Sequence, residues 1–111
     1  MDAQETQETF NEIKTQIEEK YQKMIDKISS VQKEIDDAIY KYANKSQEWI
    51  DKKIKMLTNK LNEYKKIAED WLKTQMNKLR EWVKSIEDAI KEWIEKQIAN
   101  LAMKLLEMIG L

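Results

Sequence analysis

Aliphatic residues recur along this chain at a spacing of eleven positions. Nine successive positions in one register are all aliphatic, and a chain with 41% apolar residues would match that register by chance roughly 3 times in 10,000. This first column consists of Ile17, Ile28, Ile39, Ile50, Leu61, Leu72, Val83, Ile94 and Leu105. A second column, in which only Ser46 is polar, consists of Ile13, Met24, Ile35, Ser46, Leu57, Ala68, Leu79, Ile90 and Leu101. So regular a repeat predicts one type of secondary structure throughout.

Eleven residues correspond to three turns of an α-helix at about 3.67 residues per turn, so residues eleven apart lie on nearly the same side. Within each repeat the apolar residues are three or four positions apart, as Ile13, Ile17 and Tyr21 show, and they form one stripe. Helices with this period supercoil around each other with a right-handed twist. We therefore predict an all-α fold: a long amphipathic helix with 11-residue repeats that forms a right-handed oligomeric coiled coil, bundle or helical tube.

The uninterrupted phase of the two columns predicts a single continuous helix over residues 10–109. A polar, acidic lead-in over residues 1–9 is expected before it, and a C-terminal cap at residues 110–111 after it. One alternative is a helical hairpin with a break near residues 43–47, where Ser46 interrupts the second column.

Two local signals support these helix ends. Thr9 and Glu12 match a capping box, which places the start of the helix near Phe10. Gly110 suits the left-handed conformation that closes many helices at their C-terminal end.

The four tryptophans share a third column, which lies at the flank of the apolar stripe. They are Trp49, Trp71, Trp82 and Trp93. In the first interpretation their rings cover the edge of an oligomer core, and so broad an apolar surface favours four or more chains. In the second interpretation, tryptophan and lysine mark the headgroup level of a membrane on which the helix lies.

The composition lacks several of the side chains that most often act in catalysis or metal binding. The chain has no Cys and no His, so it lacks thiolate and imidazole groups for catalysis or for binding zinc. The acidic pairs Glu18/Glu19 and Asp36/Asp37 lie away from the apolar stripe, as expected for a solvated face. We therefore expect no catalytic residues, no cofactor, no metal and no small-molecule substrate, and we predict that the chain is not an enzyme.

The charge balance limits the class of partner. The 111 residues carry 20 basic and 21 acidic side chains, a net charge of −1, which argues against nucleic-acid binding. The start of the chain is acidic and polar, so we expect no signal peptide. The most apolar stretch, residues 94–111, is interrupted by charged residues, so we expect a soluble chain without a transmembrane segment. Nothing in the sequence indicates a compartment.

The aliphatic columns at Ile13 and Ile17 resemble those of the hendecad coiled coils, which form right-handed helical bundles. The resemblance extends over residues 10–109 and implies an architecture only, so it assigns no functional residue. An eleven-residue period is also found in apolipoprotein-like and synuclein-like lipid-binding helices.

We therefore hypothesise a non-enzymatic structural protein that self-assembles into a homo-oligomeric right-handed bundle, tube or filament. The residues expected in the oligomer core are Ile13, Ile17, Met24, Ile28, Ile35, Ile39, Ile50, Leu57, Leu61, Leu72, Leu79, Val83, Ile90, Ile94, Leu101 and Leu105. Replacing Leu61 or Leu72 with Asp is expected to dissolve that assembly. The alternative hypothesis is a peripheral amphipathic helix that binds a membrane or lipid surface through its tryptophan-edged face.

Overall fold

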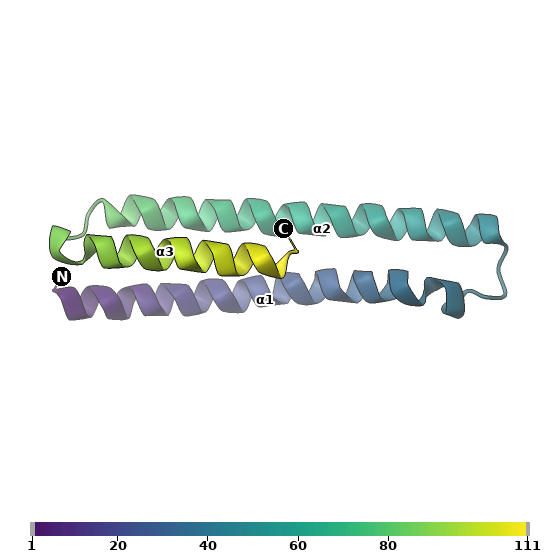
Figure 1. Ribbon diagram of the computed structural model, residues 1–111, viewed down its shortest axis with the longest axis horizontal. Coiled ribbons are helices and arrows are strands. Elements are labelled where there is room, and N and C mark those ends of the chain that lie inside the picture. Colours follow the sequence, from purple (N-terminus) through teal and green to yellow (C-terminus); the bar gives the residue numbers. More distant parts are fainter. Residues whose placement is uncertain (1, 111) are drawn as a thin grey trace.

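The protein folds into an elongated bundle of α-helices. The computed structural model describes residues 2–110, and within them the helices are α1 (Ala3–Lys41), α2 (Gln47–Val83) and α3 (Asp88–Met108), with no strand (Figure 1). The molecule measures 64 × 17 × 15 Å. The predicted all-α class is confirmed.

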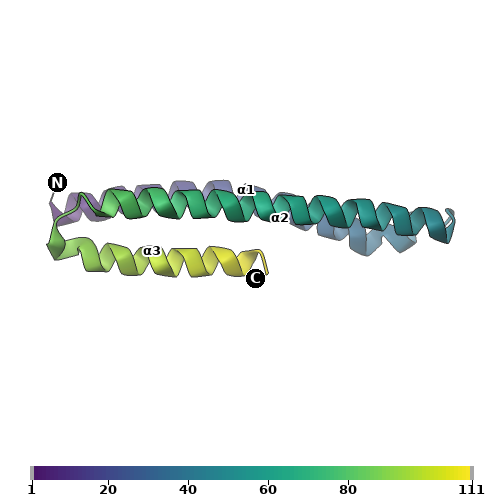
Figure 2. The ribbon, with the colours of Figure 1, turned by 90° about the horizontal axis from the view of Figure 1, so that it is seen from above.

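The helices differ greatly in length, and this difference shapes the molecule. α1 and α2 form an antiparallel hairpin that runs the full length of the bundle (Figure 1). The 21 residues of α3 extend about 31 Å at 1.5 Å per residue. α3 lies on one side of the hairpin and ends near its middle (Figure 2). The remaining part of the hairpin, residues 32–64, is only two helices thick, and we call it the arm.

The first turn, over residues 42–46, shows that the prediction of one continuous helix is wrong and that the alternative hairpin is right. Ser46 caps α2, because its side-chain oxygen accepts a hydrogen bond from the Trp49 N–H at 3.1 Å. Folding back at this turn lets the apolar stripe of α1 lie against the stripe of α2. A single chain can therefore bury what a continuous helix would have left in water.

The second turn, over residues 84–87, was not expected at all. It contains neither Gly nor Pro, and Ser85 closes it by donating its hydroxyl hydrogen to the Trp82 carbonyl oxygen at 2.7 Å. The sequence does hold a signal for it, since Ser85 and Asp88 have the spacing of a capping motif. The structure uses Glu87 as the N-cap of α3 instead, without a side-chain hydrogen bond.

The expected N-terminal lead-in is helical. The carboxylate of Asp2 caps α1 by accepting the Glu5 N–H at 2.8 Å, eight positions before the predicted start at Phe10. The lead-in forms part of the bundle, because Thr6 is buried and hydrogen-bonds to the Asp2 carbonyl. At the other end Gly110 adopts the expected left-handed conformation, with φ of 83°, and Leu111 lies outside the described residues.

The predicted core residues form the core of a single chain. Most of them are buried: Ile17, Ile28, Ile50, Leu57, Leu61, Leu72, Leu79, Val83, Ile90, Ile94, Leu101 and Leu105. Ile13, Met24 and Ile35 are partly buried and pack against that core. Ile39 is 60% exposed and lies outside this core, and its place in an oligomer core stays a prediction. Packing within one chain already buries most of the apolar stripe, so a second chain is not needed to bury these residues.

Candidate interaction surface on the arm

The part of the hairpin outside the arm is called the base half, and three specific contacts hold α3 against it. The Tyr21 hydroxyl donates a buried hydrogen bond to the Leu105 carbonyl oxygen at 2.7 Å. Lys104 forms an ion pair with Glu18 at 2.9 Å. The rings of Phe10 and Trp93 meet edge to face, with their centroids 5.9 Å apart. These contacts fix the level at which α3 ends.

The face of α1 that α3 covers continues along the arm without a cover. Ile17 and Ile28 are 4% and 7% exposed, whereas Ile39, the next residue of the same column, is 60% exposed. Eleven residues complete three helical turns, so all three side chains leave α1 on nearly the same side. Ile39 is exposed because α3 ends before it reaches that level.

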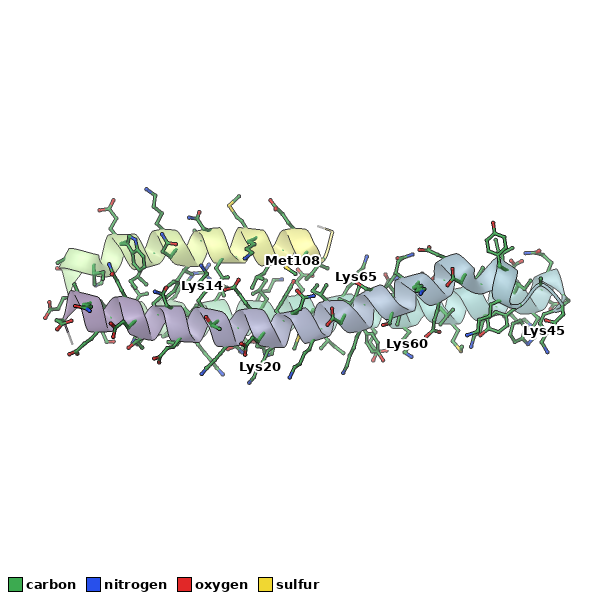
Figure 3. All side chains as sticks on the ribbon, turned by 90° about the horizontal axis from the view of Figure 1, so that it is seen from below. Lys14, Lys20, Lys45, Lys60, Lys65 and Met108 are labelled. Atoms are coloured by element: carbon green, nitrogen blue, oxygen red, sulfur yellow. The ribbon has the colours of Figure 1, made fainter. Side chains whose placement is uncertain are left out.

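The same change occurs on α2. Met76 is buried and lines a groove with Ala102 and Leu106 of α3. Eleven residues nearer the turn, Lys65 is only partly buried, and it lines a groove with the last residues of α3. Figure 3 shows Lys65 just beyond Met108 at the end of α3. Ile54, a further eleven residues along, is also only partly buried. Past the end of α3, the apolar residues of these columns are therefore Ile39 on α1, which is exposed, and Ile54 on α2, which is partly buried.

We call this part of the arm the open face. Its centre consists of Ile35, Ile39 and Ile54. Charged residues border it in equal numbers: Lys33 and Asp36 on α1, and Asp51 and Lys55 on α2. Lys33 and Asp36 also line the groove at the C-terminal end of α3, which places them on the same side as α3. The open face is thus apolar at its centre and electrically balanced at its edges.

The end of the arm, residues 39–56, differs in character and is called the tip. The rings of Tyr42 and Trp49 pack edge to face with centroids 4.8 Å apart. Lys41 and Lys53 lie over the Tyr42 ring, at 5.5 and 5.8 Å, and Lys45 lies over the Trp49 ring at 5.4 Å (Figure 3). The tip holds five lysines and two acidic residues, so it is basic in a nearly neutral molecule.

The predicted tryptophan flank divides into two kinds of environment. Trp71 and Trp82 are partly buried against the core, and the Trp71 ring lies 6.4 Å from the ring of Tyr21. Trp49 and Trp93 stay more exposed, one at the tip and the other beside Phe10. No single tryptophan-edged surface therefore runs along the molecule, because the second turn places Trp93 on α3 while the other three tryptophans lie on α2.

The pKa of Tyr21 is clearly perturbed. Burial raises the pKa of Tyr21 to about 12, and the negative charge of Glu69 adds to the shift. The hydroxyl is already engaged with the Leu105 carbonyl, so it has a structural role. Among residues 2–110, no group of three or more acidic side chains is arranged to hold a metal ion. The absence of enzymatic activity stays a prediction.

Sequence reasoning missed the open face because that surface depends on where α3 stops. The eleven-residue column gives Ile28 and Ile39 equivalent positions, yet only Ile28 is covered. The signal that could have located the surface is the capping spacing of Ser85 and Asp88, since a turn there determines where α3 begins and ends along the hairpin.

Comparison of the chain with known protein families, curated proteins and solved structures gives no match. Within the described part of the chain, none of the helices has the length and apolar character needed to cross a bilayer.

Proposed function

We propose that this protein is a non-enzymatic structural protein that self-assembles, and that a second copy of the chain covers the open face of the arm. The observation that carries the proposal is the exposure of Ile39, in a column whose preceding members are buried under α3. Burying apolar surface is the main driving force for association between proteins. The arm leaves Ile39 of α1 exposed and Ile54 of α2 only partly buried.

The sequence alone placed the whole apolar stripe in the contact between chains. Because α1, α2 and α3 bury most of that stripe within one chain, the proposed contact is restricted to the arm. Two arms that meet through their open faces would place four helices around a common core. The eleven-residue spacing on each helix favours a right-handed supercoil in that shared section.

The size of the arm indicates how tight the association is. The open face is about 25 Å long by the helical rise, and the molecule is 17 Å wide, which limits the contact to roughly 500 Å² per copy. Specific interfaces of standard size bury about 800 Å² per partner, and smaller ones are generally weak and reversible. We therefore expect dissociation on dilution.

The test is the absolute mass of the protein by light scattering over a range of concentrations. The wild-type chain is expected to shift from monomer to dimer, and Ile39→Asp is expected to remain monomeric because the charge would be buried at the contact. Its helicity and melting temperature should change little, since Ile39 is largely exposed within one chain.

Met56→Asp is the matched control for this test. Met56 is 54% exposed, which is close to Ile39, and it lies two residues after Ile54, about 200° around the helix from the open face. The control should dimerise like the wild type. A wild-type chain that stays monomeric throughout, or equal dissociation of both variants, would contradict the proposal.

Binding to a lipid surface is a second candidate, favoured by the composition of the tip. Tyr40 is 84% exposed there, close to Trp49 and to five lysines. Aromatic rings prefer the headgroup level of a bilayer, and clustered lysines are attracted to anionic lipids. In this version the tip contacts the lipid, and the long apolar stripe stays folded in the core.

Cosedimentation with phosphatidylserine-containing vesicles tests this candidate. Lys45→Glu should weaken binding more than Lys20→Glu, which changes an exposed lysine in the base half of α1 (Figure 3). Binding should also weaken in high salt and be absent with pure phosphatidylcholine vesicles. Equal retention of both variants, or no sedimentation with anionic vesicles, would exclude the tip as a lipid site.

A further inference from the structure

The position of α3 restricts how two open faces can meet. α3 lies on one side of the hairpin (Figure 2), and Lys33 and Asp36 at the edge of the open face line a groove with its C-terminal end, so α3 and the open face lie on the same side. If two copies paired with their tips in the same direction, the two α3 helices would lie between the hairpins. Packed helices are 8–10 Å apart, so two intervening helices would hold the arms too far apart for contact. A parallel pair is therefore sterically excluded.

The opposite orientation has no such obstruction. With the tips in opposite directions, each arm lies along the other arm, and each tip meets the C-terminal end of the other copy's α3. We propose that two copies pair arm to arm in an antiparallel manner about a twofold axis that crosses the middle of the arm. This inference rests on the proposed self-association and specifies its geometry.

The lengths of the segments determine the register of this pair. From Ile28, which lies beside the end of α3, to the turn at Asn44 is about 24 Å along α1. The twofold axis then lies about 12 Å from the turn, at the level of Ile35 on α1 and Ile54 on α2. Each of these apolar residues would meet its own counterpart near the axis. This arrangement is typical of isologous interfaces, in which a surface contacts itself.

The charges at the α2 edge of the open face fit the same register. By the helical rise, Asp36 and Asp51 are about 12 and 9 Å from the turn, and Lys33 and Lys55 are about 16 and 15 Å from it. Reversal about an axis 12 Å from the turn moves Asp51 to the level of Lys55 on α2 of the other copy, and it leaves Asp36 of α1 at its own level. Parallel pairing would bring aspartate to aspartate and lysine to lysine. The Asp51 and Lys55 charges of α2 therefore complement each other only in the antiparallel pair.

Single-cysteine variants test this geometry, because the natural chain has no cysteine and each variant carries one thiol. Ile54→Cys lies near the proposed axis and should form a disulfide-linked dimer under mild oxidation. Glu34→Cys lies at a similar level but lines the groove with Lys60 and Tyr64 on the other side of the arm, so it should stay monomeric under the same oxidation.

The tip distinguishes antiparallel from parallel pairing. Tyr40→Cys should not link to itself, because the two Tyr40 residues lie on opposite sides of the twofold axis, about 12 Å apart along the pair. A mixture of Tyr40→Cys and Met108→Cys should give a mixed dimer, since each tip meets the end of an α3. Rapid self-linking of Tyr40→Cys together with unlinked Ile54→Cys would overturn the antiparallel arrangement.

Charge reversal provides a measurement that needs no cross-link. Asp51→Lys should weaken the dimer about three- to tenfold, because surface ion pairs are weak and the twofold axis makes this pair occur twice. Adding Lys55→Asp should restore most of the affinity. The antiparallel geometry is wrong, although self-association stands, if light scattering shows a dimer whose affinity is unaffected by the charge reversals and the cysteine variants do not cross-link as expected. If no dimer forms at all, the proposed function itself fails.

Discussion

At the scale of single residues, Tyr21 is the clearest link between distant parts of the chain. The side chain is fully buried, and its hydroxyl donates to the carbonyl oxygen of Leu105, 84 positions away. Leu105 lies in the last turn of α3, whose final carbonyl groups have no partner within the helix. Tyr21 therefore anchors α3 and caps one of these carbonyl groups.

Replacing Tyr21 with Phe tests that role. The variant keeps the ring but leaves the Leu105 carbonyl buried without this donor, so we expect the free energy of unfolding to fall by about 1–3 kcal/mol. Chemical denaturation measures the loss. Tyr40→Phe is the control, because Tyr40 is exposed and should give no change. A Tyr21→Phe variant as stable as the wild type would show that the hydrogen bond contributes nothing.

The raised pKa of Tyr21 also makes stability depend on pH. The unfolded chain releases the phenolic proton near pH 10, whereas the folded chain holds it until its pKa of about 12. The contribution to stability is therefore complete below pH 10 and is lost as the pH rises from about 10 to about 12. Denaturation curves at several pH values should show that loss in the wild type, and Tyr21→Phe should lack this component. Parallel losses in both proteins would contradict the assignment to Tyr21.

At the scale of elements, the first turn depends on one polar residue in an apolar column. Ser46 interrupts the second column, and its hydroxyl caps α2. This is the position where the continuous-helix prediction failed. Ser46 is polar because it lies at the end of a helix, and it is not a polar residue buried within a continuous apolar stripe.

Ser46→Ala is expected to reduce the free energy of unfolding by about 1 kcal/mol, because the Trp49 N–H loses its side-chain acceptor. Ser30→Ala serves as the control, since Ser30 is an exposed residue in the middle of α1, where alanine is a better helix former. Thermal or chemical denaturation compares the two. Destabilisation by Ser30→Ala rather than by Ser46→Ala would argue against the cap.

α3 is short and depends on packing for its position. Leu101 is buried between α3 and the hairpin, so Leu101→Ala should lower the free energy of unfolding by about 2–5 kcal/mol. Met103, two residues further along, is largely exposed, and Met103→Ala should have little effect. Hydrogen exchange is expected to increase most in α3 in the Leu101 variant. Uniform exchange along the chain would show instead that the three helices unfold only as one unit.

At the scale of the whole molecule, the unequal helix lengths give a rod with a thick base and a thin arm. The single chain is 64 Å long, and an antiparallel pair with about 24 Å of overlap would be about 100 Å long. Small-angle scattering should show the maximum dimension rising toward that value with concentration. Ile39→Asp should keep the shorter dimension at every concentration. A pair of unchanged length would indicate full side-by-side overlap instead.

The burial of Leu61 changes what its replacement should do. Leu61→Asp was expected to dissolve an assembly, but Leu61 belongs to the core of a single chain. The charge would be buried within the hairpin, so we expect unfolding of the chain itself. Circular dichroism of dilute solutions should show loss of helix in the variant relative to the wild type. A folded monomeric Leu61→Asp chain would contradict this core assignment.

The pattern along the sequence predicted the helical class and a little over half of the buried residues. It could do so because the spacing of apolar side chains acts locally, through the geometry of one helix. The columns at Ile17 and Ile13 keep their phase across both turns, so the pattern looks the same for one long helix as for three short ones. The second turn and the beginning of α1 at Ala3 were missed for the same reason.

Only the tertiary structure decided which parts of the stripe remain uncovered. Ile28 and Ile39 are equivalent by sequence, and they differ because α3 reaches one of them and ends before the other. That difference depends on contacts between distant segments, such as the one between Tyr21 and Leu105, and on the lengths of the three helices together. Periodicity identifies the apolar side of a helix, but burial depends on which other helix lies over it.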